Sequence, residues 1–335
     1  MELKRVIFTH QELHGRYKPM GRMSEESDGI LLSWSASGIS FTCTASRLVF
    51  LFAPCMGEQP VSVCLMIDHY AHQYTLGGKM PVIVCDHLDE VPHTVTLLRL
   101  SEGCDGLFLT ALEMWGQAPA LLLPPAASDR RLLFIGDSLT CGYGTDSLHG
   151  DTVFRTWEEN AMHAYPFRCA SALSADYQIV SISGQGLTQD CNGDHGTLFS
   201  EFWRRPFNAP EAADMTEQTG FVPHAVIING GTNDENGKAS PDVFARAAHD
   251  FLTEVRAVYP KAEIIWYYGL VATVFTPVIR EVICDFDDPH TTFLEAPRVW
   301  PDDVQRMGCN THPTSFAHAE IASHLTAELK KRLGW

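Results

Sequence analysis

The feature that most constrains the fold of this chain is a change in sequence periodicity near residue 130. Before it, short runs rich in β-branched and aromatic residues, such as 39–44 and 107–114, are separated by Gly, Pro, Asp and Ser. Runs of this length and spacing are typical of a β-sandwich or a jelly roll. A Pro-Pro pair at 124–125 indicates a connector, because such pairs end regular structure. The sequence therefore predicts a β-sandwich domain over residues 1–125.

After this connector, strands alternate with helices. Residues 132–135 and 225–228 are short, wholly apolar runs of the kind that are buried in a parallel sheet. A helix is expected to begin after Ser240, because this cap residue is followed by a proline and an early carboxylate. Such alternation predicts a three-layer α/β/α sandwich with a mainly parallel sheet over residues 126–335. Functional loops should leave the carboxyl ends of its strands.

Charge and composition limit the partners that the chain can bind. Its formal net charge is −17, whereas a protein that binds nucleic acids or anionic membranes needs clustered Lys and Arg. Neutral or cationic small substrates stay open. No run approaches the roughly 18 apolar residues that span a bilayer, and the first residues lack the apolar stretch of a secretory signal. The ten cysteines include no Cys-x-x-Cys pair, which favours buried free thiols. We expect a cytoplasmic protein without a metal or a cofactor.

A serine follows the first apolar strand of the second half. In the run Gly136-Asp-Ser-Leu-Thr-Cys-Gly-Tyr-Gly144, Ser138 lies between a buried strand and a turn, where a base could reach its hydroxyl. The glycines allow tight turns and the close approach of a ligand. An ordinary strand-to-helix turn, with Asp137 and Ser138 as capping residues, is the alternative. Alone, Gly-Asp-Ser is weak evidence for catalysis.

Three later loops also follow predicted strands. In 181–187, Ser-Ile-Ser-Gly-Gln-Gly-Leu, two glycines leave backbone N–H groups that could face a cleft. Asn233 could aim its amide at a developing oxyanion or form a local Asx-turn. His312 precedes the last predicted helix, where the chain returns to the same edge of the sheet. Four such loops in this order favour one catalytic site over four unrelated turns.

Together these blocks resemble those of the GDSL, or SGNH, hydrolase superfamily. Within it, the chain is similar to carbohydrate esterase family two, the acetyl-xylan and acetyl-glucomannan esterases. The resemblance rests on the runs 134–144, 159–161, 183–187, 227–234 and 308–313. The family's N-terminal jelly roll would account for the β-rich first third, where 93–102 also fits the pattern. The resemblance therefore covers nearly the whole chain.

The resemblance implies a mechanism and names its residues. Ser138 would attack the ester carbonyl while His312 removes its proton and later protonates the leaving alcohol. The oxyanion would be held by the N–H groups of Ser138 and Gly186 and by the side-chain amide of Asn233. An ungapped match of the strand and loop favours Gly186 over Gly184 for this role.

The chain departs from the superfamily pattern beside the histidine. Members usually have an aspartate three residues before it, but this chain has Cys309, and a thiol cannot supply the same buried charge. The family includes members with a Ser-His dyad, in which a backbone carbonyl orients the ring. We predict a dyad, and the spacing of Asn310, Asp302 and Asp303 assigns none of them firmly as an assisting residue.

Other polar and aromatic residues receive more ordinary interpretations. Trp203 lies in a long segment between strands and is a candidate for stacking on a sugar ring, with core packing as the alternative. Asp137 and Asp234 are expected to cap loops. His318 and His324, on the last predicted helix, are expected to pack in the core or lie at the surface.

The leading hypothesis is therefore a serine esterase that deacetylates O-acetylated mannan, glucomannan or xylan oligosaccharides. A short-chain acyl or lipid esterase on the same scaffold is one alternative. A carbohydrate-binding protein without catalysis is another, motivated by the missing aspartate. The polysaccharide, the acetylated hydroxyl and the oligomeric state stay open at this point.

Overall fold

A computed structural model of the chain divides it into two compact units, which we describe separately. One comprises Met1–Ala127 with Pro206–Asn208, and the other comprises Ser128–Arg205 with Ala209–Trp335. The structure describes residues 3–54, 59–79, 81–103, 106–206 and 220–335.

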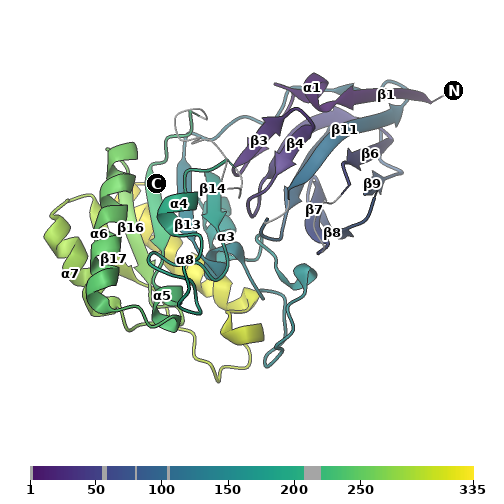
Figure 1. Cartoon of the computed structure of the whole chain (residues 1–335). Coiled ribbons are helices and arrows are strands. Elements are labelled where there is room, and N and C mark those ends of the chain that lie inside the picture. Colours follow the sequence, from purple (N-terminus) through teal and green to yellow (C-terminus); the bar gives the residue numbers. More distant parts are fainter. Residues whose placement is uncertain (1–2, 55–58, 80, 104–105, 207–219) are drawn as a thin grey trace. The chain divides into compact units, whose positions relative to one another are not determined.

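The N-terminal unit is built from two antiparallel sheets (Figure 1). The first has the order β3 (Met23–Glu26), β4 (Gly29–Leu32), β11 (Leu107–Gly116), β6 (Arg47–Phe52), β9 (Val82–Cys85), with β1 (Lys4–Thr9) also on β11. The second has the order β12 (Ala120–Leu121), β5 (Gly38–Thr44), β10 (His93–Arg99), β7 (Val61–Ile67), β8 (Tyr70–Leu76), with β2 (Lys18–Met20) also on β5. One short helix, α1 (His10–Leu13), follows β1.

The core of this unit comes from alternate residues of its strands. Ile39 and Phe41 of β5 and Leu48 and Phe50 of β6 are all buried in one hydrophobic cluster. This period of two is what a strand with one buried face requires, because successive side chains point to opposite faces. The prediction of a β-rich N-terminal third is confirmed.

The C-terminal unit contains one five-stranded sheet in which all neighbours are parallel. Its order is β14 (Asp176–Ser181), β13 (Arg131–Gly136), β15 (Ala225–Asn229), β16 (Glu263–Tyr268), β17 (Thr291–Glu295). The central strands are buried along almost their whole length, which explains their continuous apolar runs. The predicted parallel sheet is confirmed.

Each strand of this sheet is followed in the sequence by at least one helix (Figure 1). The helices are α2 (Ser138–Cys141), α3 (Tyr165–Ala172), α4 (Phe199–Phe202), α5 (Thr232–Asn236), α6 (Pro241–Val258), α7 (Thr276–Phe286) and α8 (Ser315–Leu333), with short 3₁₀ turns η1 (Thr156–Glu158) and η2 (Cys309–Thr311). The predicted start of α6 is confirmed, since the Ser240 hydroxyl accepts a hydrogen bond from the N–H of Val243. Its buried face includes Phe244 and Leu252, each of which contributes about 1.5–3 kcal/mol through burial.

Two composition-based expectations can be compared with the described residues. Their cysteines are free thiols, and five of them are buried: Cys43, Cys64, Cys141, Cys169 and Cys309. Within the same residues, no helix combines the length and apolar character that crossing a bilayer requires.

Candidate active site

The carboxyl ends of the parallel strands bring the predicted site residues together. Ser138 follows β13 and is the first residue of α2, whose N-terminus is capped by Asp137 through a 3.0 Å bond from the N–H of Leu139. Gly184 follows β14, and Asn233 lies in α5, just after β15. His312 lies between η2 and α8. Short strand-to-helix connections thus hold Ser138 and Asn233, and the segment before α8 brings His312, 174 positions from Ser138, to the same site.

Ser138 and His312 form a direct hydrogen bond. The distance between Ser138 Oγ and His312 Nε2 is 2.7 Å, and Ser138 is only 7% exposed. On the other side of the ring, Nδ1 lies 2.9 Å from the backbone carbonyl oxygen of Asn310. A carbonyl only accepts hydrogen bonds, so Nδ1 carries the proton and Nε2 accepts the proton of the serine hydroxyl. This is the arrangement of a nucleophile with its general base.

The usual aspartate is replaced by a backbone carbonyl in this geometry. Among the described residues, no carboxylate is hydrogen-bonded to His312. The carboxylate of Asp303 accepts hydrogen bonds from Gln305 and Arg306 instead. Cys309 is fully buried, and its N–H donates to Ser147 Oγ at 2.7 Å.

Burial keeps the His312 ring neutral. It lowers the pKa of His312 to about 4, although the hydrogen bond to Asn310 acts in the opposite direction. A neutral imidazole at physiological pH can accept a proton, as a general base must.

Of the predicted oxyanion donors, Asn233 lines the pocket beside Ser138, whereas Gly186 does not. Asn233 Nδ2 donates to the Gln185 carbonyl at 2.7 Å and, more weakly, to Asp137 Oδ2 at 3.3 Å. Gly184, with a φ of 78°, lines the pocket beside Ser138. Gly186 is not among the pocket-lining residues that the structure describes, and a Cβ there would lie 2.6 Å from a carboxylate oxygen of Asp234.

A pocket of about 350 Å³ opens beside the Ser-His pair. Polar groups from Asn233 and Glu235 line it, together with the ring of Tyr143. Its apolar lining comes from Leu139, Val271, Ala272, Pro301 and Met307. This size and mixture suit a small organic ligand held by a few polar groups.

Both aspartates that were expected to cap loops do so. Asp137 caps α2, as described above. Asp234 is fully buried and accepts hydrogen bonds from the N–H groups of Leu187 at 3.0 Å and Thr188 at 2.8 Å. Burial raises the pKa of Asp234, and these bonds oppose that shift. Asp234 therefore fixes the loop that carries the two candidate glycines.

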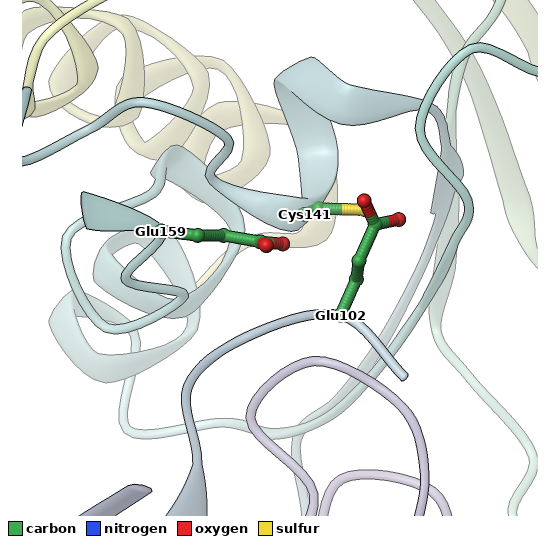
Figure 2. A group of neighbouring side chains, drawn as sticks. All are labelled: Glu102, Cys141 and Glu159. Atoms are coloured by element: carbon green, nitrogen blue, oxygen red, sulfur yellow. The ribbon is translucent and has the colours of Figure 1, made fainter. Parts of the chain in front are cut away.

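Behind the nucleophile, α2 is attached to the neighbouring strand. The Sγ of Cys141, the last residue of α2, donates to the Ser181 hydroxyl of β14 at 3.2 Å. Cys141 and Glu159, which lies directly after η1, are buried residues of this unit (Figure 2). Neither belongs to the pocket lining described above.

The proposed sugar contact of Trp203 is wrong. This residue is 0% exposed, its indole N–H donates to Glu254 at 3.0 Å, and its ring packs against Phe251 and Tyr259. A fully buried ring has no free face on which a sugar could stack. Core packing, the alternative, is confirmed.

The sequence reasoning missed two pocket residues. Tyr143 lies in the serine loop itself, and its ring centroid is 4.4 Å from that of His312. Glu235 follows Asp234, and its carboxylate accepts hydrogen bonds from the Tyr268 hydroxyl and the N–H of Val274. An aromatic residue between two glycines was the available signal for Tyr143, whereas nothing local distinguished Glu235.

The chain is similar to proteins of a known hydrolase family. Residues 134–319 match the model of the GDSL-like Lipase/Acylhydrolase family. The match includes the loops of Ser138, Asn233 and His312.

Two curated relatives match this chain over only part of their own length. It is 33% identical over 226 residues to the cellulase/esterase CelE of Acetivibrio thermocellus, a match that covers 64% of this chain and 27% of that protein. It is 26% identical over 253 residues to an acetylxylan esterase / glucomannan deacetylase of Cellvibrio japonicus, covering 72% of this chain and 68% of that protein. The chain thus spans about a quarter of the length of CelE.

Solved structures of similar fold cover nearly the whole chain. A family two carbohydrate esterase from Cellvibrio japonicus has a TM-score of 0.89 at 22% identity, covering 100% of this chain and 99% of that one. One from Clostridium thermocellum, in complex with cellohexaose, has a TM-score of 0.85 at 24% identity, covering 95% of this chain and 99% of that one. At these identities, the likeness establishes a shared fold.

Proposed function

Because the chain belongs to the GDSL-like lipase/acylhydrolase family, we propose that it is a serine esterase that removes acetyl groups from O-acetylated mannan, glucomannan or xylan oligosaccharides. The observation that carries the proposal is the 2.7 Å hydrogen bond between Ser138 Oγ and His312 Nε2 beside an open pocket. The substrate class is supported by the relative named an acetylxylan esterase / glucomannan deacetylase.

The reaction proceeds through an acetyl-enzyme. Ser138 Oγ attacks the acetyl carbonyl carbon while His312 Nε2 takes the hydroxyl proton. The tetrahedral intermediate collapses, the sugar oxygen leaves, and the protonated His312 gives it the proton. His312 then takes a proton from a water molecule, whose oxygen attacks the acetyl carbonyl carbon. The second intermediate collapses, Ser138 Oγ leaves and takes the proton from His312, and the acetic acid released ionises to acetate.

A dyad suffices for these proton transfers. The Asn310 carbonyl holds the ring in the tautomer with Nδ1 protonated, which leaves Nε2 free to accept. Since a carbonyl has no net charge, it stabilises the imidazolium less than a carboxylate would. The low pKa of His312 is consistent with this difference.

Three donors hold the oxyanion in this proposal. The first is the N–H of Ser138 at the start of α2, and Asn233 Nδ2 exchanges its long bond to Asp137 for one to the oxyanion. For the glycine donor, the pocket lining supports Gly184 over Gly186, in contrast to the sequence match.

The substrate is neutral, which suits a chain with a net charge of −17. The apolar part of the pocket lining accommodates the acetyl methyl group. We further propose that the N-terminal sheets form the family's jelly roll. The C-terminal unit then corresponds to its three-layer α/β/α domain, as the two sets of sheets and the high TM-scores support.

Mass spectrometry of acetylated manno- and xylo-oligosaccharides before and after incubation tests the proposal. The wild-type chain should remove acetyl groups, and Ser138→Ala, which differs by one oxygen atom, should leave them in place. Loss of acetyl from neither substrate would contradict the proposed function.

Rates on p-nitrophenyl esters separate the alternatives. A deacetylase prefers acetyl sharply, whereas rates that hold or rise with acyl length would instead identify a general acyl or lipid esterase. A carbohydrate-binding protein without catalysis predicts background activity that Ser138→Ala leaves unchanged.

A further inference from the structure

We infer that Tyr143 is a positioning residue, which holds His312 and the carbonyl that orients it, in place of the missing aspartate. This inference rests on the proposed Ser-His mechanism and goes beyond it. Tyr143 touches both partners of the hydrogen bond between His312 Nδ1 and the Asn310 carbonyl. Its ring centroid is 4.4 Å from that of His312, with planes inclined by 42°, and its hydroxyl accepts a hydrogen bond from Asn310 Nδ2 at 3.0 Å.

The carbonyl of Asn310 needs such support because of its backbone conformation. Asn310 and Thr311 have φ values of 47° and 59°, in the left-handed region. Asparagine tolerates this region, but a β-branched threonine is rarely found there. Such backbone persists only where the surrounding contacts fix it. The turn that aims the carbonyl at His312 therefore depends on its attachments.

Four hydrogen bonds attach Asn310. Its N–H donates to the Asp151 carbonyl at 3.1 Å, and its side chain donates to the Tyr143 hydroxyl. Its own carbonyl accepts from His312 Nδ1 and, at 2.6 Å, from the Thr311 hydroxyl. Asp151 is held in turn by an ion pair with Arg155. Tyr143 also contacts the imidazole ring of His312.

Tyr143 is itself fixed in place. Its ring stacks on Phe154 at a centroid distance of 4.7 Å and an angle of 18°. It lies between Gly142 and Gly144, which have φ values of 95° and 69°. A Cβ on Gly144 would lie 2.8 Å from Cys309 Sγ, so the serine loop and the histidine turn meet without room for a side chain. One loop thus supplies the nucleophile and, five residues later, the support of its base.

Graded substitutions separate the two contacts of Tyr143. Tyr143→Phe keeps the ring and removes the acceptor for Asn310, so kcat should fall about three- to tenfold, the usual value of one hydrogen bond, with KM unchanged. Tyr143→Leu also removes the ring from His312. A misplaced catalytic group costs up to about 100-fold, so kcat should fall roughly 30- to 100-fold.

The pH profile reports a change that general loss of structure would not produce. Burial is the main cause of the low His312 pKa, and the Tyr143 ring is part of that burial. In Tyr143→Leu, water reaches the imidazole, and the acid limb of kcat/KM should move from about pH 4 toward the ordinary value of about 6.5. In Tyr143→Phe, the limb should stay in place.

Nitrogen NMR and a double-mutant cycle complete the test. The protonated Nδ1 signal of His312 should persist in the wild type and broaden or exchange in Tyr143→Leu. Asn310→Gly keeps the left-handed backbone but removes the side-chain amide. In the double variant Asn310→Gly/Tyr143→Phe, kcat should therefore fall no further than in the more affected single variant. Tyr70→Phe, at an exposed tyrosine of the N-terminal unit, is the matched control.

Wild-type kcat and an unmoved acid limb in a folded Tyr143→Leu variant would overturn the inference, as would additive losses in the cycle. All rates are measured on p-nitrophenyl acetate, which requires the Ser-His pair but no sugar site. Failure of the deacetylase proposal therefore shows as activity on this ester without activity on acetylated oligosaccharides. The role of Tyr143 is still decided in that case.

Discussion

At the scale of single residues, the unusual feature of the site is a carbonyl where a carboxylate is expected. The Asn310 oxygen fixes the His312 tautomer through a 2.9 Å bond, but it adds no negative charge to stabilise the imidazolium. Burial then dominates, and the base stays neutral to low pH.

This balance predicts the pH dependence of the reaction. His312 works as a base only when unprotonated, so kcat/KM should be constant above its pKa and fall tenfold per pH unit below it. With a pKa of about 4, activity on p-nitrophenyl acetate should change little between about pH 7 and about pH 5. An acid limb near 6.5 in the wild type would contradict this expectation.

The position of Trp203 predicts a stability effect without a catalytic one. Trp203→Ala removes a fully buried ring and should lower the free energy of unfolding by about 3–5 kcal/mol, with KM unchanged where the variant is folded. Trp157→Ala, at a half-exposed tryptophan, should change stability by less than about 0.5 kcal/mol. Urea unfolding and kinetics check both. A raised KM with unchanged stability would restore the sugar-contact hypothesis.

The residues that sequence could not assign share a physical reason. Ser138, Asn233 and His312 could be assigned because their side chains can take part in catalysis and because they lie in loops after predicted strands. The orienting group is a backbone carbonyl, which every residue has, so only the fold can select Asn310. A buried and an exposed aromatic ring look alike in the sequence, so the sequence left both a sugar contact and core packing open for Trp203.

At the scale of elements, helix α8 carries a titratable group into the core. His318 is fully buried, and its Nδ1 accepts the N–H of Tyr165, the first residue of α3, at 3.1 Å. Of the two expected positions for His318, in the core or at the surface, the structure shows the first. This bond joins the start of one helix to another helix and requires a neutral ring.

Burial lowers the pKa of His318 to about 3, compared with about 6.5 in the unfolded chain. Between these values the unfolded state binds more protons, so the free energy of unfolding should decrease as the pH falls from about 6.5 toward 3. His318→Gln keeps an acceptor for Tyr165 but does not titrate. Urea unfolding at about pH 7.5 and about pH 4.5 should show a smaller decrease in the variant than in the wild type. Equal decreases would show that His318 does not contribute.

The sequence predicted the elements whose patterns are unambiguous. Strands β13 and β15 contain the wholly apolar runs 132–135 and 225–228, and α6 has both a cap and a periodic face. Helix α7 and strand β17 were not predicted. Helix α7 begins without a side-chain cap. Strand β17 is only partly buried, and packing in the sheet stabilises this strand more than its local sequence preference does.

At the scale of the whole molecule, the residues of the proposed site lie in one unit. Ser138, Tyr143, Asn233 and His312 all belong to the C-terminal unit, and each lies at or after the carboxyl end of a parallel strand or before the last helix. The acidic side chains are spread over the whole chain and give it a net charge of −17. The electrostatic field of the molecule therefore acts on any substrate that approaches the site.

This charge predicts a selective salt effect. For neutral acetylated oligosaccharides, kcat/KM should change less than about twofold between low and high salt, because no net charge is attracted or repelled. For acetylated xylo-oligosaccharides that carry uronic acid groups, repulsion slows the approach, and kcat/KM should rise as salt screens it. Parallel measurements at constant pH compare the two, and Ser138→Ala gives the background. A neutral substrate with strong salt dependence, or an acidic one that reacts faster at low salt, would show that local positive groups outweigh the net charge.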